Sequence, residues 1–149
     1  MLKARLESDL RDAMKARDEL VTSTLRMALT AVRNAEVAGK EARQLSDDEV
    51  LAVLTKEAKK RREAATAFGD AGREAQAAKE RAEEEVLAGY LPAQLSDEEL
   101  SHLVRGALSE GGFSGMGSMG PAMKAAQAAV AGRAEGGRVA AEVRRQLGA

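Results

Sequence analysis

The side chains best suited to acid–base chemistry are concentrated in one glutamate-rich stretch. Its carboxylates occupy four nearby positions, namely Glu80, Glu83, Glu84 and Glu85. Paired carboxylates act as general acid and base when they are buried close together. These lie in an alanine-rich amphipathic segment, a context that favours solvated side chains over a catalytic pair.

Residues that bind metals or act as nucleophiles are scarcer than carboxylates in this chain. The chain contains no cysteine, which excludes disulfides, thiolate metal sites and cysteine nucleophiles. Its single histidine, His102, cannot form a metal cluster by itself, and we expect it to be exposed on a helix. The sequence therefore predicts no catalytic residues, no metal site and no cofactor.

A glycine-rich segment, Gly115–Gly120, matches the dinucleotide-binding pattern G-x-G-x-x-G. That pattern binds a cofactor when it connects a β-strand to a helix within a βαβ unit. Here it follows a predicted helix, and no strand is predicted nearby. We interpret it as a connector before the next helix, whose free backbone N–H groups can still hold a phosphate of a larger ligand.

Glu57 and Arg61 form an acid–base pair of a different kind. They are four residues apart on the apolar side of a predicted helix, with the acid first, which is the favourable order for an ion pair. No nucleophile or second acid–base group is fixed beside them in the sequence. We predict a partly buried bridge between helices rather than a catalytic site.

Basic residues on the same predicted helix fan over one solvent-facing arc. They are Lys56, Lys59, Lys60 and Arg62. The arc can contact phosphates, or it can be an ordinary solvated face. Because acidic residues are as numerous across the chain, we favour the solvated face.

The last part of the chain, residues 111–149, carries a local surplus of positive charge. Two acids, Glu135 and Glu142, stand against five basic residues: Lys124, Arg133, Arg138, Arg144 and Arg145. A net charge of +3 is the best electrostatic argument for a polyanionic partner. The alternative is that Arg144 and Arg145 serve the dipole of the last helix. The sequence leaves both open.

Composition restricts how such a partner can be recognised. The 149 residues include 23 basic and 24 acidic ones, a net charge of −1, so nucleic acid is not attracted by the surface as a whole. Phe68, Tyr90 and Phe113 are the only aromatic residues, which nearly excludes a base-stacking surface. The chain shows neither a signal peptide nor an apolar run of about 18 residues, and we expect a cytoplasmic protein without membrane contact.

Apolar residues recur at helical spacing along the first part of the chain. Residues 2–17 and a segment from Val21 to about Gly39 form the first two predicted helices. Ser46 opens the third with a capping box, and a fourth runs from about Arg73 to Tyr90, before Pro92. We predict an N-terminal helical domain of about four helices over residues 1–91.

The remaining chain has the signals of a smaller helical module. Ser96 repeats the capping box, and Pro121 occupies a first-turn position, so the sixth helix should run from there to about Ala131. A last helix starts near Gly136. We predict an all-α protein with a three-helix tail over residues 92–149 and a hinge near residues 91–95.

Several short motifs resemble those of the YqeY family along nearly the whole chain. In the N-terminal part they are Leu25-Arg26-Met27, Asn34-Ala35-Glu36 and Ala71-Gly72-Arg73; in the C-terminal part they are Tyr90-Leu91-Pro92-Ala93-Gln94-Leu95, Met119-Gly120 with Met123-Lys124, and Gly132-Arg133-Ala134-Glu135-Gly136. Their order and spacing carry the resemblance. Two positions depart from it: Glu135 stands where the family often has aspartate, and Ala75-Gln76 replaces an acidic–apolar pair.

The resemblance implies a function, because the family shares its C-terminal module with the tail of the B subunit of glutamyl-/aspartyl-tRNA amidotransferase. There the tail helps to hold tRNA while other parts of the enzyme perform the chemistry, a carbon–nitrogen ligase reaction with glutamine as amido donor. By analogy, Lys124, Arg133 and Arg138 are candidates for phosphate contacts. We expect a non-catalytic, tRNA-associated adaptor whose partners include tRNA and an amidotransferase or aminoacyl-tRNA synthetase.

Two other hypotheses remain open at this stage. The apolar faces of the C-terminal helices can instead grip a helix of a partner protein, with RNA irrelevant. A standalone amidotransferase is the third, and the residues do not support it, because neither the catalytic cradle of the B subunit nor an amidase-like serine–lysine apparatus occurs in the sequence.

Overall fold

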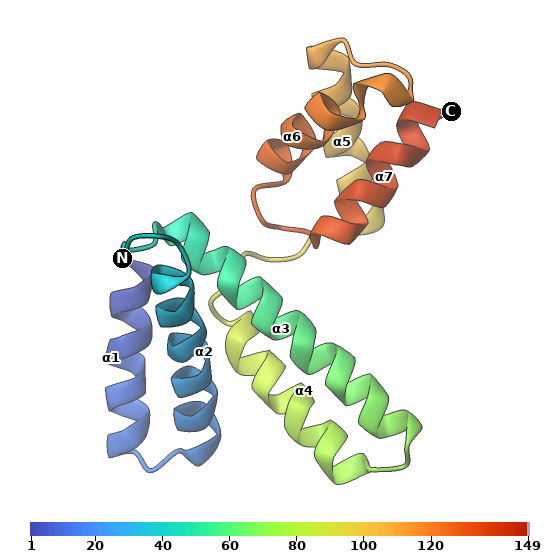
Figure 1. Ribbon diagram of the computed structural model, residues 1–149. Coiled ribbons are helices and arrows are strands. Elements are labelled where there is room, and N and C mark those ends of the chain that lie inside the picture. The colour runs from blue at the N-terminus through green and yellow to red at the C-terminus, as the bar shows by residue number, and fades with distance from the viewer. Residues whose placement is uncertain (149) are drawn as a thin grey trace. The chain divides into compact units, whose positions relative to one another are not determined.

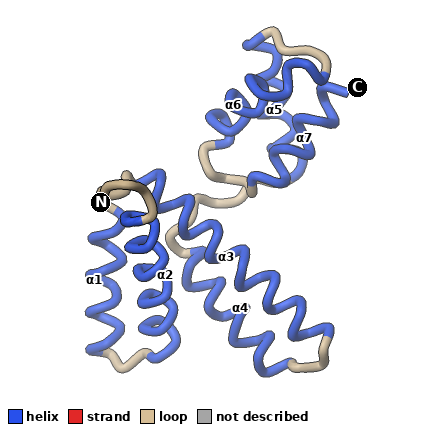
Figure 2. The backbone as a smooth tube through the Cα atoms, in the orientation of Figure 1, coloured by secondary structure: helices blue, strands red, loops and turns tan. Residues whose placement is uncertain are grey.

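The computed structural model describes residues 1–148, and every regular element in that range is helical (Figures 1 and 2). The first four helices are α1 (Leu2–Lys15), α2 (Glu19–Val37), α3 (Asp47–Asp70) and α4 (Glu74–Ala88). The others are α5 (Asp97–Gly111), the short 3₁₀ helix η1 (Met116–Ser118), α6 (Met119–Val130) and α7 (Gly136–Gly148). The predicted all-α class is confirmed for these residues.

The helices gather into two compact units. Unit 1 comprises Met1–Leu91, and unit 2 begins at Pro92. Unit 1 contains α1–α4, and unit 2 contains α5–α7 together with η1. Each unit has its own group of buried apolar side chains, so each is described separately below.

Unit 1 is built from helices whose apolar stripes meet in one core. Leu6 of α1, Leu25 and Leu29 of α2, Leu54 of α3 and Leu87 of α4 are at most 1% exposed. Each lies on the inner face of its helix, and Leu25 and Leu29 are four residues apart, the helical spacing that the sequence pattern predicts. The α3 and α4 helices lie side by side as a long hairpin (Figure 1).

Both predicted capping boxes are present. Ser46 Oγ accepts from the Glu49 N–H (3.2 Å), and Glu49 Oε1 accepts from the Ser46 N–H (3.1 Å). Ser96 and Glu99 make the same exchange at 3.1 and 3.2 Å. Each box satisfies two backbone N–H groups at a helix start, and so fixes where α3 and α5 begin.

The three helices of unit 2 enclose a second small core. Val104 of α5, Ala122 and Ala126 of α6, and Val143 of α7 are fully buried there. Alanine on α6 lets the helices approach closely, as expected for a chain with three aromatic residues. α6 begins at Met119, two residues before the predicted Pro121.

The G-x-G-x-x-G segment connects α5 to α6. The left-handed residue Gly112 (φ 66°) ends α5, η1 follows, and no strand precedes the motif within the described residues. Gly115 also has a positive φ (73°), a conformation that glycine adopts without strain. The interpretation of this segment as a connector is confirmed.

Candidate nucleic-acid interface

Two of the predicted phosphate-binding residues are exposed cations without a competing partner. Lys124 lies on α6 and Arg144 on α7, and both side chains are exposed. Within residues 1–148, neither side chain is hydrogen-bonded or ion-paired. Their full charge is therefore available to an external anion.

Arg133 and Arg138 instead bind the chain segment that enters unit 2. Arg133 Nε donates to the Ala93 carbonyl (3.2 Å), and the Leu95 N–H donates to the Arg133 carbonyl (2.7 Å). Arg138 Nη2 donates to the Leu95 carbonyl and to Asp97 Oδ1, both at 2.9 Å. These bonds hold Ala93–Leu95 against the rest of unit 2, and the hinge near residues 91–95 stays a prediction.

Arg145 is bound on its own helix and to α5. Its Nε lies 2.7 and 3.0 Å from the two carboxylate oxygens of Glu142, and its Nη2 donates to Ser101 Oγ (3.3 Å). The hydrogen bond from Arg145 lowers the pKa of Glu142, and the same contact raises the pKa of Arg145. Both groups are thus held in their charged forms.

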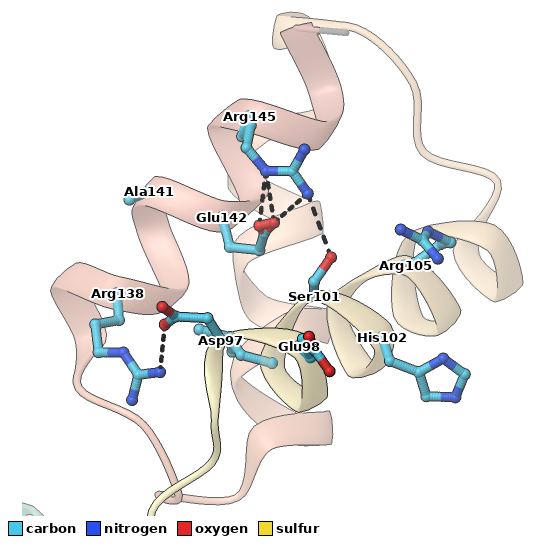
Figure 3. A pocket seen from close by; sticks show the side chains of 10 residues that line it. Asp97, Glu98, Ser101, His102, Arg105, Arg138, Ala141, Glu142 and Arg145 are labelled. Atoms are coloured by element: carbon cyan, nitrogen blue, oxygen red, sulfur yellow. Dashed lines mark hydrogen bonds and ion pairs between the residues drawn. The ribbon is translucent and has the colours of Figure 1, made fainter.

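Arg138 and Arg145 border an open groove of about 750 Å³ between α5 and α7 (Figure 3). Leu100 and Ala141 also line it, as do His102 and Arg105. His102 is exposed, as predicted, and Figure 3 shows its ring pointing away from the other labelled side chains.

Arg105 is a further cation of this groove that the sequence did not single out. It is exposed, and within the described residues it makes no ion pair or hydrogen bond through its side chain. Its position could have indicated it, because Ser101 and Arg105 are four residues apart and so lie on the same face of the predicted fifth helix. The surplus of positive charge was considered only over residues 111–149, and Arg105 precedes that range.

The net charge of unit 2 differs from that of residues 111–149 once the residues of α5 are included. Residues 92–110 contain four acids and only one basic residue, Arg105, which offsets the +3 of residues 111–149. The groove itself is lined by Arg105, Arg138 and Arg145 and by the acids Asp97, Glu98 and Glu142. Unit 2 therefore has no net charge to attract a polyanion at long range, and attraction must come from its unpaired cations.

The basic arc of α3 is largely neutralised by acids of its own unit. Lys59 lies 4.0 Å from Glu63, Lys60 lies 3.2 Å from Glu57, and Arg62 Nε lies 3.0 Å from Glu84. Lys56 is exposed and has no such partner within the described residues. This pattern fits a solvated face, the interpretation that we favoured, better than a phosphate-binding one.

Arg61 forms the predicted buried bridge, with one correction. Its Nη1 lies 2.6 Å from Glu57 Oε2, and its Nη2 lies 3.6 Å from Met27 Sδ on α2. Glu83 of α4, which we expected to be solvated, is 5% exposed and lies 3.6 Å from Arg61 Nε. Glu83 shares a face of α4 with the buried Leu87, but its cation comes from another helix, which the helical period alone does not indicate.

Other kinds of site have little support in the described part of the chain. Residues 1–148 contain no group of three or more histidine, aspartate or glutamate side chains placed to hold a metal ion. None of the helices in that range is long and apolar enough to cross a membrane.

Comparison with known proteins places the chain in a family. Residues 3–147 match the family described as Yqey-like protein. The chain is also similar to "Uncharacterized protein C22F3.15" of Schizosaccharomyces pombe (strain 972 / ATCC 24843), with 36% identity over 97 residues. That alignment covers 64% of this chain and 76% of the yeast protein.

Proposed function

Because this chain belongs to the YqeY family, we propose that it is a tRNA-associated helical protein whose unit 2 contacts the RNA backbone. In this proposal the protein performs no catalysis alone. It acts in the cytoplasm beside an amidotransferase or an aminoacyl-tRNA synthetase, which supplies the reactive groups.

The observation that carries the proposal is the presence of unpaired cations on α5, α6 and α7. Arg105, Lys124 and Arg144 are exposed and have no acidic partner within the described residues. Phosphate contacts of this kind position a protein on RNA without reading its sequence. With only three aromatic residues in the chain, recognition of folded RNA by shape and backbone is the mode that the composition allows.

A salt series against total tRNA tests the proposal. We expect a gel-shift affinity that falls with salt, at a slope corresponding to a few phosphates. The double charge reversal Lys124→Glu with Arg144→Glu should weaken binding at least tenfold. The matched control reverses Lys40 and Lys79 in unit 1, which are also exposed and unpaired within the described residues.

Two results would count against RNA binding. Absence of a shift at low salt rejects it outright. Equal loss of affinity in the unit 1 control shows that net charge matters and that the surface of unit 2 does not.

A second function is favoured by a specific surface of unit 2. Most large apolar side chains of α5–α7 lie in the core, and Leu103 and Phe113 are among those that are only partly buried. A separate open groove of about 710 Å³ borders α5 and α6, and its walls are mostly small residues: Gly106, Ala107, Gly111, Ala125, Ala128 and Ala129. A partner helix can approach such a wall closely, and the zero net charge of unit 2 suits a protein partner. A complex that survives high salt and nuclease would support this function over RNA binding.

A further inference from the structure

Arg138 differs from the unpaired cations Arg105, Lys124 and Arg144, because part of its guanidinium is already in use. Its Nη2 donates to the Leu95 carbonyl and to Asp97 Oδ1, both at 2.9 Å. A guanidinium presents five N–H donors in a planar fork, and both of the edges that form paired hydrogen bonds with a phosphate include Nη2. Neither edge of Arg138 is therefore fully free for an external anion.

Asp97 is the acceptor that is more easily displaced. Its side chain is 97% exposed, whereas that of Arg138 is 33% exposed. An exposed ion pair of this kind contributes little to stability and is weakened by salt. The Leu95 carbonyl, in contrast, belongs to a residue that is 4% exposed and packed into the core of unit 2.

We propose that Asp97 competes with RNA phosphates for Arg138, so that binding of the polyanion displaces Asp97 while Arg138 keeps its bond to the Leu95 carbonyl. This inference rests on the proposed RNA-binding function and specifies how that surface is regulated. Because coupling between two equilibria is reciprocal, anything that releases Arg138 from Asp97 strengthens phosphate binding.

Two isosteric substitutions separate this competition from a simple change in net charge. Asp97→Asn and Glu98→Gln each remove one negative charge from the first turn of α5, and both residues line the groove. Within the described residues, only Asp97 of the two is ion-paired with Arg138. A neutral amide holds the guanidinium less strongly than a carboxylate does.

The first measurement is the tRNA affinity of the two variants by gel shift. We expect the Asp97→Asn protein to bind about two- to fivefold more tightly than the Glu98→Gln protein, the range that corresponds to one exposed ion pair. In an Arg138→Gln background this difference should vanish. Equal affinities of the two variants, or a difference that persists without Arg138, would overturn the proposal.

The second measurement does not depend on RNA. Inorganic pyrophosphate is titrated into the full-length protein while the backbone amide resonance of residue 97 is followed by NMR. We expect this resonance to shift in the wild type and in the Glu98→Gln protein, to shift at lower pyrophosphate concentration in the Asp97→Asn protein, and to stay constant in the Arg138→Gln protein. An unresponsive wild-type amide overturns the proposal.

The two measurements fail in distinguishable ways. If tRNA does not bind but pyrophosphate produces the expected pattern, the proposed function is rejected and the competition at Arg138 stands. If tRNA binds but Asp97→Asn and Glu98→Gln are equal, the function stands and the competition is rejected.

Discussion

Arg61 in unit 1 and Arg138 in unit 2 are both held by carboxylates, yet the two sites differ in burial. The side chain of Arg61 is 4% exposed, and its acids Glu57 and Glu83 are 12% and 6% exposed. The side chain of Arg138 is 33% exposed, and that of Asp97 is 97% exposed. The same pairing chemistry therefore operates in two dielectric environments.

Burial decides what each pair can do. Charges removed from water must keep their partners, because an uncompensated buried charge is costly. Water and salt can replace the partner of an exposed charge at little cost. We infer that the Arg61 cluster maintains the packing of α2, α3 and α4, and that Arg138 is free to exchange one anion for another.

The largest expected effect is at the buried site. Arg61→Ala leaves Glu83 buried without a cation and leaves Glu57 with only the exposed Lys60, and we expect it to destabilise unit 1 by about 3–5 kcal/mol. Urea unfolding of the purified variant measures this loss. Arg62→Ala, one residue further along α3, removes an exposed arginine paired with Glu84, and should cost less than about 1 kcal/mol.

A triple variant asks whether the charges themselves are needed. Replacing Glu57 and Glu83 by leucine and Arg61 by methionine exchanges the buried cluster for apolar side chains. This change should be close to neutral or stabilising, because desolvation offsets much of the attraction in a buried ion pair. Arg61 Nε lacks a hydrogen-bond partner among the described residues, which adds to the cost of the native arrangement. A triple variant as unstable as Arg61→Ala would contradict this account.

Sequence reasoning predicted local structure better than the contacts between helices. The capping boxes at Ser46 and Ser96 and the pairing of Glu57 with Arg61 depend on residues three or four apart, so the helical period determines them. Glu83 was misjudged because its partner is 22 residues away in the chain.

The candidate site was less predictable than the fold for a related reason. Arg133 and Arg138 have the charge of phosphate ligands, but their acceptors, Ala93 and Leu95, are 40 or more residues away. Every residue has a backbone carbonyl, so the residue types do not show which carbonyl accepts a hydrogen bond from an arginine. Only the tertiary arrangement shows which cations are free and which are engaged.

The two capping boxes allow the stabilities of the two units to be tested with matched substitutions, each expected to cost about 1 kcal/mol. Ser46→Ala and Ser96→Ala each remove one side-chain acceptor at a helix start, and each should cost about 1 kcal/mol. We propose that the units are separate folding domains, in which case each variant destabilises only its own unit. Hydrogen exchange resolved by unit tests this, and equal acceleration in both units after either substitution would show that they unfold together.

A smaller difference between the boxes should appear at acidic pH. Hydrogen bonds from Arg43 and from the Ser46 backbone lower the pKa of Glu49 to about 2, from an ordinary value of 4.5. Ionised Glu49 therefore stabilises unit 1 fully above pH 4.5, and this contribution is lost as pH falls toward 2. The stability difference between wild type and Glu49→Gln should shrink over that window.

Glu99 provides the matched comparison in unit 2. Its pKa is lowered by hydrogen bonds from Ser96 and, less strongly, by the charge of Arg133, which makes no hydrogen bond to it within residues 1–148. We expect the Glu99→Gln difference also to shrink below pH 4.5, but to be smaller than that of Glu49→Gln at pH 7. Acid titration of unfolding at several urea concentrations measures both, and a larger effect at Glu99 would contradict the role assigned to Arg43.

The smallest effects on stability are expected at the more exposed arginines of unit 2, and they test whether Arg138 differs from the buried Arg61. Arg138→Gln removes a partly exposed ion pair and one carbonyl contact, and should lower the stability of unit 2 by about 1 kcal/mol or less. Arg144→Gln, on the same helix, removes no contact among the described residues and should change stability by less than about 0.5 kcal/mol. The Leu95 amide should exchange faster in the first variant and at the wild-type rate in the second. If Arg138→Gln instead cost as much as Arg61→Ala, its guanidinium would be a structural element like Arg61, and exchange of Asp97 for a phosphate would be too costly to occur.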